Sequence, residues 1–414
     1  MPKGFYRLIL AQFASGLADN AFMILGIFFL QEQGHPGWWS PLLKFAFTLS
    51  YVVLAGLVGP VADAFAKGRL MACMNMLKLC GLVLLVAGAH PFLAFALSGM
   101  AAAVYAPAKY ALVTETVPSA LLVKANAWLE VTVVLAVLLG IACGGFLSQW
   151  QAPMGLDAAI SHFIVAFMGA APTSTGPALA LVGAVYLASA WLNMGLASLD
   201  AQRRSTPLTW RALQWTLFWQ NNRRLWADPL GGLSLFVTTL CWGVGAVLQF
   251  AVLQWAQTKA GLSLQQGAYL QAVVALGVIT GAMLAARFYK IANARKAMPW
   301  SLVLAALLPC MALTESVWLA LPLLLVAGCA GGMLLVPMNA LLQHRGQKIL
   351  SSGRSIAVQG FNENLSVLLM LGFYSLLLAA QVPLVGVMLL LMLPLLLSAL
   401  PMLKQWQQRA RRAV

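Results

Sequence analysis

Charged residues are scarce in this chain. Only 8% of its 414 residues are Asp, Glu, Lys or Arg, whereas a soluble globular domain carries about 25%. Hydrophobic residues account for 62% of the sequence, which is too much for one anchor attached to a soluble domain. The composition therefore excludes a soluble protein and predicts an integral membrane protein with many spans.

The sequence also lacks the motifs of common enzyme and metal sites. Its four His residues are scattered, and its six Cys residues form no Cys-x-x-Cys pair. It contains no P-loop, His-Glu-x-x-His or Gly-x-Ser-x-Gly motif. Cys73 and Cys80 could share a helix face, but we interpret them as small core residues. We therefore expect no enzyme activity, no metal and no cofactor.

The basic residues are distributed as topology signals of a membrane protein. The net charge of +15 does not indicate a nucleic-acid partner, because most Lys and Arg lie in short connections between apolar runs. Every second connection is basic, and only Lys44 and Lys259 fall on the opposite side. The positive-inside rule then predicts that both termini are cytoplasmic. The first apolar run is longer than the roughly 7–15 residues of a signal-peptide core, so we expect an uncleaved first helix.

Twelve apolar runs approach the roughly 20 residues that a helix needs to cross a bilayer. They cover approximately 7–31, 41–62, 70–89, 91–113, 123–147, 176–198, 230–256, 265–288, 298–317, 319–341, 355–379 and 383–402. The predicted fold class is an all-α membrane protein with twelve transmembrane helices in two six-helix pseudo-repeats. We expect a first bundle at 1–199, a cytoplasmic linker at 200–229, and a second bundle with a basic tail at 230–414.

Two connecting segments have features of their own. The linker contains Trp210, Trp215, Trp219 and Trp226 among its arginines. Aromatic and basic residues at helical spacing predict an amphipathic helix on the inner leaflet, and a solvated tether is the alternative. The segment 148–175 is long for an external loop, and its apolar stretch is too short to span. We expect a short interfacial or re-entrant helix there.

One polar pattern occurs twice, about half a chain apart. The first copy reads Pro107-Ala108-Lys109, then Asn126-x-x-x-Glu130, then Gly140. The second reads Pro337-Met338-Asn339, then Gln359-x-x-x-Glu363, then Gly372. A carboxylate inside an apolar helix is costly, so it usually has a partner or a role. Matching carboxylates in two halves predict a duplicated protein with a polar path between the halves.

The first half contains most of the charge expected inside the membrane. Asp19 lies near the middle of the first span, where we expect it to line a water-filled path; helix packing is the alternative. Lys109 could pair with Asp19, Glu115 or Glu130, or it could snorkel to the interface. Glu115 is expected at the cytoplasmic mouth, and Lys78 is expected to be an internal counter-charge.

Amides replace most of this charge in the second half. They are Gln249, Gln254, Asn339, Gln343, Gln359, Asn362 and Asn364, with Glu363 as the carboxylate. We therefore expect a cavity with one charged wall and one apolar wall, which suits an amphiphile better than a sugar.

The connection after the second span reads Gly59-Pro60-Val61-Ala62-Asp63-Ala64-Phe65-Ala66-Lys67-Gly68-Arg69. It resembles the Gly-x-x-x-Asp-x-x-x-Gly-Arg signature of the major facilitator superfamily, with one extra residue before Gly-Arg. Asp63 is expected to interact with a helix N-terminus or an Arg. We predict that Asp63, Lys67 and Arg69 take part in gating.

Several further runs resemble the bacterial lysophospholipid transporters, a branch of that superfamily. They are Ala18-Asp19-Asn20-Ala21, Tyr105-Ala106-Pro107-Ala108-Lys109-Tyr110, Leu122-Val123-Lys124-Ala125-Asn126, Val336-Pro337-Met338-Asn339-Ala340-Leu341-Leu342-Gln343 and Ala357-Val358-Gln359. The resemblance implies a multi-pass protein of the Gram-negative inner membrane. It implies inward movement of lysophosphatidylethanolamine and lysophosphatidylglycerol without a proton or sodium gradient. An acyltransferase/acyl-carrier-protein synthetase at the cytoplasmic face then re-acylates them.

The resemblance also implies where the substrate path lies. It matches Asp19, Asn20, Lys109 and Glu115 to polar positions of that path, whereas Gln249 stands where an arginine is expected. Together with the repeated pattern, the predicted substrate-contacting residues are Asp19, Asn20, Lys109, Glu115, Asn126, Glu130, Gln249, Asn339, Gln359 and Glu363.

Two other function classes remain open at this stage. One is a proton-coupled exporter of amphipathic drugs, in which Asp19, Glu130 or Glu363 titrates. The other is a membrane scaffold that transports nothing.

Overall fold

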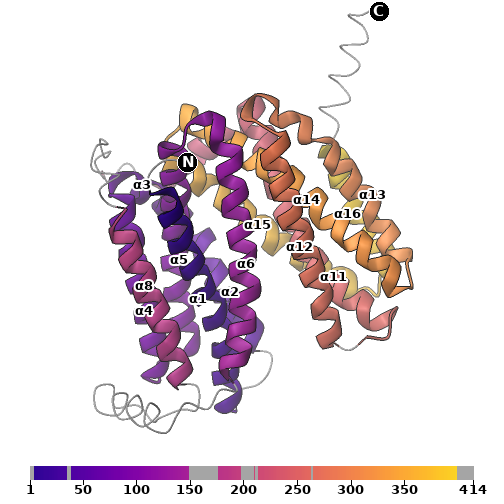
Figure 1. The fold of residues 1–414 in the computed structure, drawn as a ribbon, viewed down its shortest axis with the longest axis horizontal. Coiled ribbons are helices and arrows are strands. Elements are labelled where there is room, and N and C mark those ends of the chain that lie inside the picture. Colours follow the sequence, from indigo (N-terminus) through magenta and orange to yellow (C-terminus); the bar gives the residue numbers. More distant parts are fainter. Residues whose placement is uncertain are drawn as a thin grey trace, which may run out of the picture. The chain divides into compact units, whose positions relative to one another are not determined.

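The computed structural model describes residues 4–34, 39–148, 176–196, 209, 213–262 and 264–398. Within these ranges the regular elements are helices, and none is a strand (Figure 1). The helix expected within 148–175 lies outside the described residues, except for Ser148. Trp210 and the basic C-terminal tail also lie outside them.

The helices follow the order expected from the apolar runs, because an apolar segment can satisfy its own backbone hydrogen bonds in lipid only as a helix. In the first half they are α1 Phe5–Glu32, α2 Trp39–Val53, α3 Ala55–Ala64, α4 Lys67–Val86, α5 Pro91–Thr116, the short 3₁₀ helix η1 Ser119–Leu121, α6 Leu122–Ser148 and α8 Gly176–Met194. In the second half they are α10 Trp215–Ala227, α11 Pro229–Thr258, α12 Leu264–Phe288, the 3₁₀ helix η3 Ile291–Ala297, α13 Pro299–Leu313, α14 Val317–Ile349, α15 Ser352–Ala379 and α16 Leu384–Ser398.

Among the described residues, ten helices are long and apolar enough to cross a membrane. The pair α2 and α3 counts as an eleventh span, and α16 is a shorter apolar helix at the position of the twelfth. The prediction of a multi-pass, all-α membrane fold is confirmed.

The second predicted span is broken rather than continuous. Its two parts, α2 and α3, meet at Leu54 with a bend of 66°. Pro60 inside α3 has no N–H to donate to the Gly56 carbonyl, which weakens the first turn of α3. A Cβ on Gly56 would lie 3.2 Å from the Trp215 ring, so α10 packs directly against this turn.

The chain separates into two compact units. The first combines Met1–Thr116, Thr132–Asn221 and Leu350–Gly360, and the second combines Val117–Val131, Asn222–Ile349 and Phe361–Val414. Each unit thus includes a short segment from the opposite half of the sequence. These segments contain the first turns of α6 and α15, which are the second helices of the two copies of the repeated pattern. The expected boundaries at 200–229 stay a prediction.

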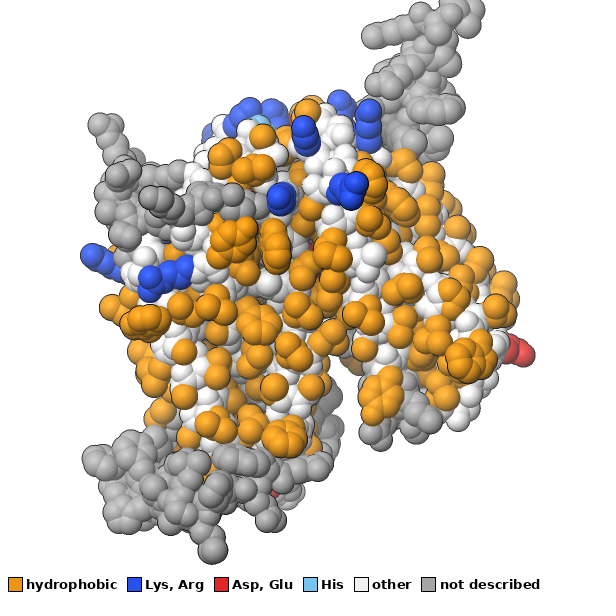
Figure 2. Space-filling model, in the orientation of Figure 1, with side chains coloured by type: hydrophobic (Ala, Val, Ile, Leu, Met, Phe, Trp, Pro, Cys, Tyr) orange, Lys and Arg blue, Asp and Glu red, His pale blue; other side chains and the backbone are white. Residues whose placement is uncertain are grey.

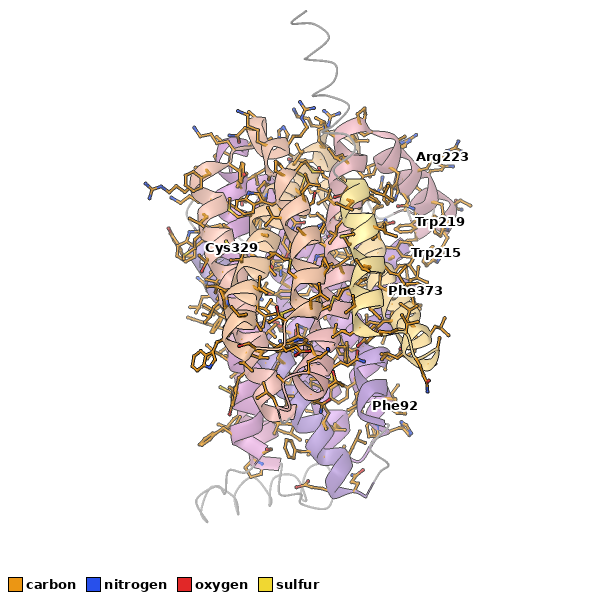
Figure 3. The ribbon with its side chains drawn as sticks, turned by 90° about the vertical axis from the view of Figure 1, so that its right-hand side faces the viewer. Phe92, Trp215, Trp219, Arg223, Cys329 and Phe373 are labelled. Carbon is orange, nitrogen blue, oxygen red and sulfur yellow. The ribbon has the colours of Figure 1, made fainter. Side chains whose placement is uncertain are left out.

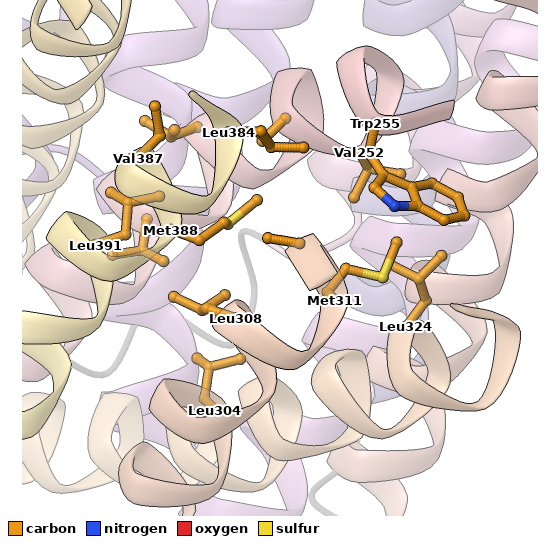
Figure 4. Close-up of a cluster of buried hydrophobic side chains, with 14 of the residues drawn as sticks. Val252, Trp255, Leu304, Leu308, Met311, Leu324, Leu384, Val387, Met388 and Leu391 are labelled. Carbon is orange, nitrogen blue, oxygen red and sulfur yellow. The ribbon is translucent and has the colours of Figure 1, made fainter. Parts of the chain in front are cut away.

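Each unit has its own apolar core. In the first unit, side chains of α1, α4, α5 and α8 form a cluster in which the Phe22 and Phe95 rings stack with centroids 4.4 Å apart. In the second unit, the cluster lies among α11, α13, α14 and α16 (Figure 4). There Trp255 is fully buried and donates its indole N–H to the Thr314 carbonyl at 2.7 Å.

Large apolar side chains also cover the outer flanks of the helices. Trp191 and Trp318 are 68% and 83% exposed, and hydrophobic side chains dominate the face drawn in Figure 2. A soluble protein rarely exposes apolar patches of this extent. These flanks are the surfaces that contact lipid in a multi-pass membrane protein.

Candidate functional site

A buried ion pair lies in the first unit. Lys78 of α4 is only 1% exposed, and its Nζ is 2.7 Å from Asp19 Oδ2 of α1. Asp19 is 20% exposed, so one side of its carboxylate is accessible. Lys78 was expected to be an internal counter-charge, and Asp19 is its partner.

Aromatic rings surround this pair. The Tyr186 hydroxyl donates to Asp19 Oδ1 at 2.9 Å. Lys78 Nζ lies 5.0 Å from the ring centroid of Tyr105 and 5.8 Å from that of Tyr186. A cation at this distance from a ring face is attracted to it, and the attraction is stronger where water is excluded. The ammonium group is therefore held by a carboxylate and two rings together.

A chain of neutral polar groups continues from the pair through the unit. Lys78 Nζ donates to Ser15 Oγ at 2.9 Å, and Ser15 Oγ donates to Asn75 Oδ1 at 2.8 Å. Asn75 Nδ2 then donates to Ser189 Oγ at 2.9 Å. All three neutral side chains are at most 1% exposed. Each donor has an acceptor, so the network ties α1, α4 and α8 together without leaving a costly unpaired group.

Lys109 forms a second buried cationic position in the same unit. Its Nζ donates to Gln12 Oε1 at 3.3 Å and lies 4.4 Å from the Tyr110 ring centroid. Gln12 in turn donates to the Thr132 hydroxyl of α6. Lys109 is only 8% exposed, so the alternative of a snorkelling interfacial lysine is wrong.

Two of the partners considered for Lys109 carry other ion pairs. Asp19 is paired with Lys78, and Glu115 Oε2 is 3.1 Å from Lys67 Nζ. Glu115 thus joins the end of α5 to the start of α4, where Lys67, one of the predicted gating residues, lies.

Asp63 caps the start of α15, as the motif predicted for a helix N-terminus. Its Oδ1 accepts from Gly353 N at 2.8 Å, and its Oδ2 accepts from the Ser351 hydroxyl. Arg354 Nε is 4.0 Å from Oδ2. A negative charge at a helix N-terminus satisfies free N–H groups and complements the helix dipole. Asp63 therefore joins α3 to a segment almost 300 residues later in the chain.

Glycines make this contact possible. A Cβ on Gly59 would lie 2.9 Å from Arg354 Cα, and a Cβ on Gly353 would lie 2.6 Å from Asp63 Oδ1. Both separations are shorter than real Cβ contacts. Arg69, the third expected gating residue, is exposed, and no ion pair of it is found within the described ranges.

The second unit contains a closed amide pair. Asn126 Nδ2 of α6 donates to Gln343 Oε1 of α14 at 2.9 Å, and Gln343 Nε2 donates back to Asn126 Oδ1 at 2.8 Å. Both side chains are at most 3% exposed. Asn126 is therefore anchored by a residue from the second half of the chain.

An ion pair near the start of α11 was missed by the sequence reasoning. Asp228 caps this helix, accepting from Leu230 N and Gly231 N at 3.2 and 2.7 Å. It also accepts from Arg345 Nε at 3.1 Å and from Arg345 Nη2. The hydrogen bond from Arg345 is the main reason that the pKa of Asp228 is lowered. The Asp-Pro sequence was a local signal for the cap.

The remaining predicted site residues differ in burial. Glu130, Asn339 and Gln359 are 6–8% exposed. Glu363 is half-buried, whereas Gln249 is exposed, and its backbone carbonyl accepts a hydrogen bond from Gln271 Nε2 at 2.9 Å. These residues stay predictions as substrate contacts.

Asn20 packs against the glycine of the first repeat copy. Its amide donates to the Gly16 carbonyl at 2.8 Å. A Cβ on Gly140 would lie 2.7 Å from Asn20 Cβ, so this glycine lets α6 approach α1 closely. Gly372 has no neighbour within 4 Å of such a Cβ. The two copies of the pattern therefore differ in packing as well as in charge.

The described residues hold no group of three or more His, Cys, Asp or Glu side chains placed to bind a metal ion. The contacts described above offer recognition by buried cations, carboxylates, amides and tyrosines, on helices that also bring the two halves of the sequence into contact.

The sequence matches the family model of the Major Facilitator Superfamily over residues 8–370. It is 37% identical to the lysophospholipid transporter LplT of Serratia proteamaculans, over 91% of this chain and 89% of that one. It is 35% identical to the transporter of the same name from Yersinia enterocolitica, over 93% and 90% of the two chains.

Solved structures agree in fold. A bacterial homologue of the iron transporter ferroportin in an outward-facing state matches with a TM-score of 0.70 and 15% identity, over 97% of this chain and 99% of that one. The fucose:proton symporter FucP of E. coli matches with a TM-score of 0.67 and 15% identity, over 95% and 97%. The chain thus belongs to the major facilitator superfamily of membrane transporters, in the same family as the Serratia and Yersinia proteins.

Proposed function

We propose that this transporter moves lysophospholipids, lysophosphatidylethanolamine and lysophosphatidylglycerol in particular, inward across the bacterial inner membrane. The relatives named as lysophospholipid transporters support the substrate class. The observation that carries the proposal is a pair of buried cations, Lys78 and Lys109, inside a unit with apolar outer flanks. We further propose that both termini are cytoplasmic and that a cytoplasmic-face acyltransferase/acyl-carrier-protein synthetase re-acylates the product.

The two buried lysines have different roles in this proposal. Lys78 is paired with Asp19 and is 1% exposed, so it holds the carboxylate in place. Lys109 Nζ donates to Gln12 Oε1 and lies over the Tyr110 ring, at a position that the family resemblance matches to the substrate path. We assign the lipid phosphate to Lys109, because a charge-assisted hydrogen bond contributes about 1.5–3 kcal/mol. Asp19, Asn20 and Glu130 complete the polar wall, and the single acyl chain stays against apolar side chains or lipid.

The contact between Asp63 and the start of α15 supports a conformational cycle. Alternating access requires contacts between the two sequence halves to break and form again. Hydrogen bonds of a carboxylate to a hydroxyl and a backbone N–H can exchange with water at modest net cost. We therefore propose that Asp63 stabilises one state of the cycle, with the Lys67–Glu115 pair fixing the short connection that follows α3.

Flipping of lysophospholipid in reconstituted vesicles tests this proposal. Lys109→Ala should lower inward movement at least about ten-fold, because losing one charge-assisted hydrogen bond costs at least about 1.4 kcal/mol of binding free energy. Arg287→Ala, which changes an exposed residue of α12, is the matched control and should flip at the wild-type rate. Equal rates for the two variants, both folded, would contradict the assignment of Lys109.

Proton-coupled export of amphipathic drugs is the competing function. The buried carboxylate of Glu130 favours it, since a group in an apolar helix can carry a proton. Dissipating the proton gradient separates the two functions. Drug export should stop, whereas lysophospholipid flipping should continue at a similar rate.

A further inference from the structure

A partly open recess lies in the first unit, where α3, α10 and the start of α15 meet. Its walls are Ala55, Gly56, Gly59 and Pro60 of α3, Phe218 and Asn221 of α10, and Arg354 and Ala357 of α15. Six of these eight residues are apolar or glycine. The two polar ones, Arg354 and Asn221, both carry hydrogen-bond donors.

Neither polar side chain has all of its hydrogen-bonding groups paired within the described residues. Arg354 Nε is buried and has no hydrogen-bond partner within the described ranges. Its closest carboxylate oxygen, Asp63 Oδ2, is 4.0 Å away and accepts from the Ser351 hydroxyl, while Gly353 N donates to Oδ1. Asn221 is 5% exposed, and no hydrogen bond of its amide is found in the part of the chain that the structure describes. An unpaired buried donor is costly, so Arg354 Nε, with the Asn221 amide lining the same recess, favours an acceptor that comes from outside the chain.

The recess matches an anionic group attached to an apolar body. A guanidinium group and an amide are donors suited to phosphate oxygens, while Phe218 and Pro60 offer apolar contact. Asp63 reduces the local positive charge, but both of its oxygens accept hydrogen bonds from the protein. Arg354 is 29% exposed, so the recess is accessible from its surroundings.

Helix α10 indicates that these surroundings are lipid headgroups. Trp215, Trp219 and Arg223 recur every four residues and lie along one side of α10 (Figure 3). The two Trp side chains are 39% and 50% exposed, whereas Phe218 beside them is 5% exposed, with its ring centroid 5.3 and 5.7 Å from those of Trp215 and Trp219. Tryptophan with arginine on an amphipathic helix is typical of the membrane interface. A phospholipid lying beside α10 would have its phosphate at the level of the recess.

We propose that this recess binds the phosphodiester of a cytoplasmic-leaflet phospholipid, as a structural ligand and not as the transported substrate. The bound phosphate accepts hydrogen bonds from Arg354 and Asn221 at once. It therefore bridges α10 and α15 against α3, at the place where Asp63 caps α15. A ligand that binds only this arrangement stabilises it by mass action. Anionic lipid then favours the state in which α3 and α15 are in contact.

The test uses the purified full-length protein in detergent, with dioleoylphosphatidylglycerol as the probe. Dioleoylglycerol is the control lipid, because it has the same acyl chains and no phosphate. We expect the phospholipid to raise the midpoint of thermal unfolding in a saturable manner, and dioleoylglycerol to leave it unchanged. Native mass spectrometry should show one phosphatidylglycerol that is retained more strongly than the rest.

Variants locate the binding to the recess. Asn221→Asp keeps the shape of the side chain and places a negative charge against the phosphate, so the apparent affinity should fall at least about ten-fold. Arg223→Gln, on the exposed side of the same helix, should bind as the wild type does. Arg354→Gln is a second recess variant. If Arg354→Gln does not fold, Asn221→Asp alone provides the test.

Three outcomes would overturn the proposal. The first is stabilisation of the wild type and Asn221→Asp at the same lipid concentration. The second is equal stabilisation by dioleoylglycerol, which would show that acyl chains alone act. The third is the same shift with inorganic phosphate at equal concentration, which would assign the recess to a free anion instead of a lipid.

Discussion

Replacing Asp19 by Asn leaves Lys78 charged and 1% exposed, without the carboxylate 2.7 Å away. At that distance two unit charges attract by about 6 kcal/mol with an effective dielectric constant near 20. Desolvation of both groups offsets much of this attraction, so the pair contributes little net stability. Removing one partner is different, because the other charge stays buried. Breaking a buried pair in this way costs about 3–5 kcal/mol.

The cost should depend on which partner is removed. Lys78→Met leaves Asp19, which is 20% exposed and still accepts from the Tyr186 hydroxyl. Asp19→Asn leaves an ammonium with almost no access to water. We therefore expect Asp19→Asn to lower the free energy of unfolding by more than Lys78→Met. The double variant should recover about 2 kcal/mol or more relative to the sum of the single changes.

Unfolding in mixed micelles of a mild detergent and sodium dodecyl sulfate, followed by circular dichroism, measures these differences. All four proteins of the cycle are compared under one condition. A larger loss for Lys78→Met, or additive losses in the double variant, would refute the reasoning from burial.

Three other substitutions test two close glycine contacts and the ion pair of Asp228. Gly140→Ala should destabilise the protein by about 1–3 kcal/mol, because the new Cβ would lie 2.7 Å from atoms of α1; Gly372→Ala has open space and should be neutral or stabilising in the same unfolding assay. Gly353→Ala places a Cβ 2.6 Å from a carboxylate oxygen and should slow flipping in vesicles, whereas Gly360→Ala in the same helix should not. Asp228 has a lowered pKa in the folded protein, so its stabilising contribution is present above about pH 4 and is lost as the pH falls through the folded pKa. Asp228→Asn should abolish this loss of stability at acid pH, measured as the midpoint of thermal unfolding over a series of pH values. The same fall of the midpoint in the variant and the wild type would contradict the role of the ion pair.

Local sequence signals predicted the helices, because the length of an apolar run determines whether it can span a bilayer. The break in the second span was not predicted, since a bend at Leu54 depends on what packs against α3 as well as on Pro60. Each copy of the repeated pattern falls on two consecutive long helices, α5 with α6 and α14 with α15. The pattern did not reveal that Gly140 is tightly packed while Gly372 is not, because packing depends on the neighbouring helix.

Partners of polar residues were harder to predict than their positions. The motif indicated that Asp63 meets a helix N-terminus, but no local signal could select α15 among the helices. Lys78 was recognised as a counter-charge, yet its partner follows only from how α1 and α4 pack. Arg345 was interpreted as a topology signal alone, so its pair with Asp228 was missed.

Each unit contains a short segment from the opposite half of the sequence, and this determines when each unit can be completed during synthesis. The first unit includes Leu350–Gly360, so it stays incomplete until nearly nine-tenths of the chain has been made. Until then the Asp63 carboxylate lacks the hydroxyl and the backbone N–H that it binds in the folded protein. Contacts between residues so distant in sequence form late and slowly. If synthesis stopped after the first six spans, Asp63 of the first unit would therefore lack its partners at the start of α15.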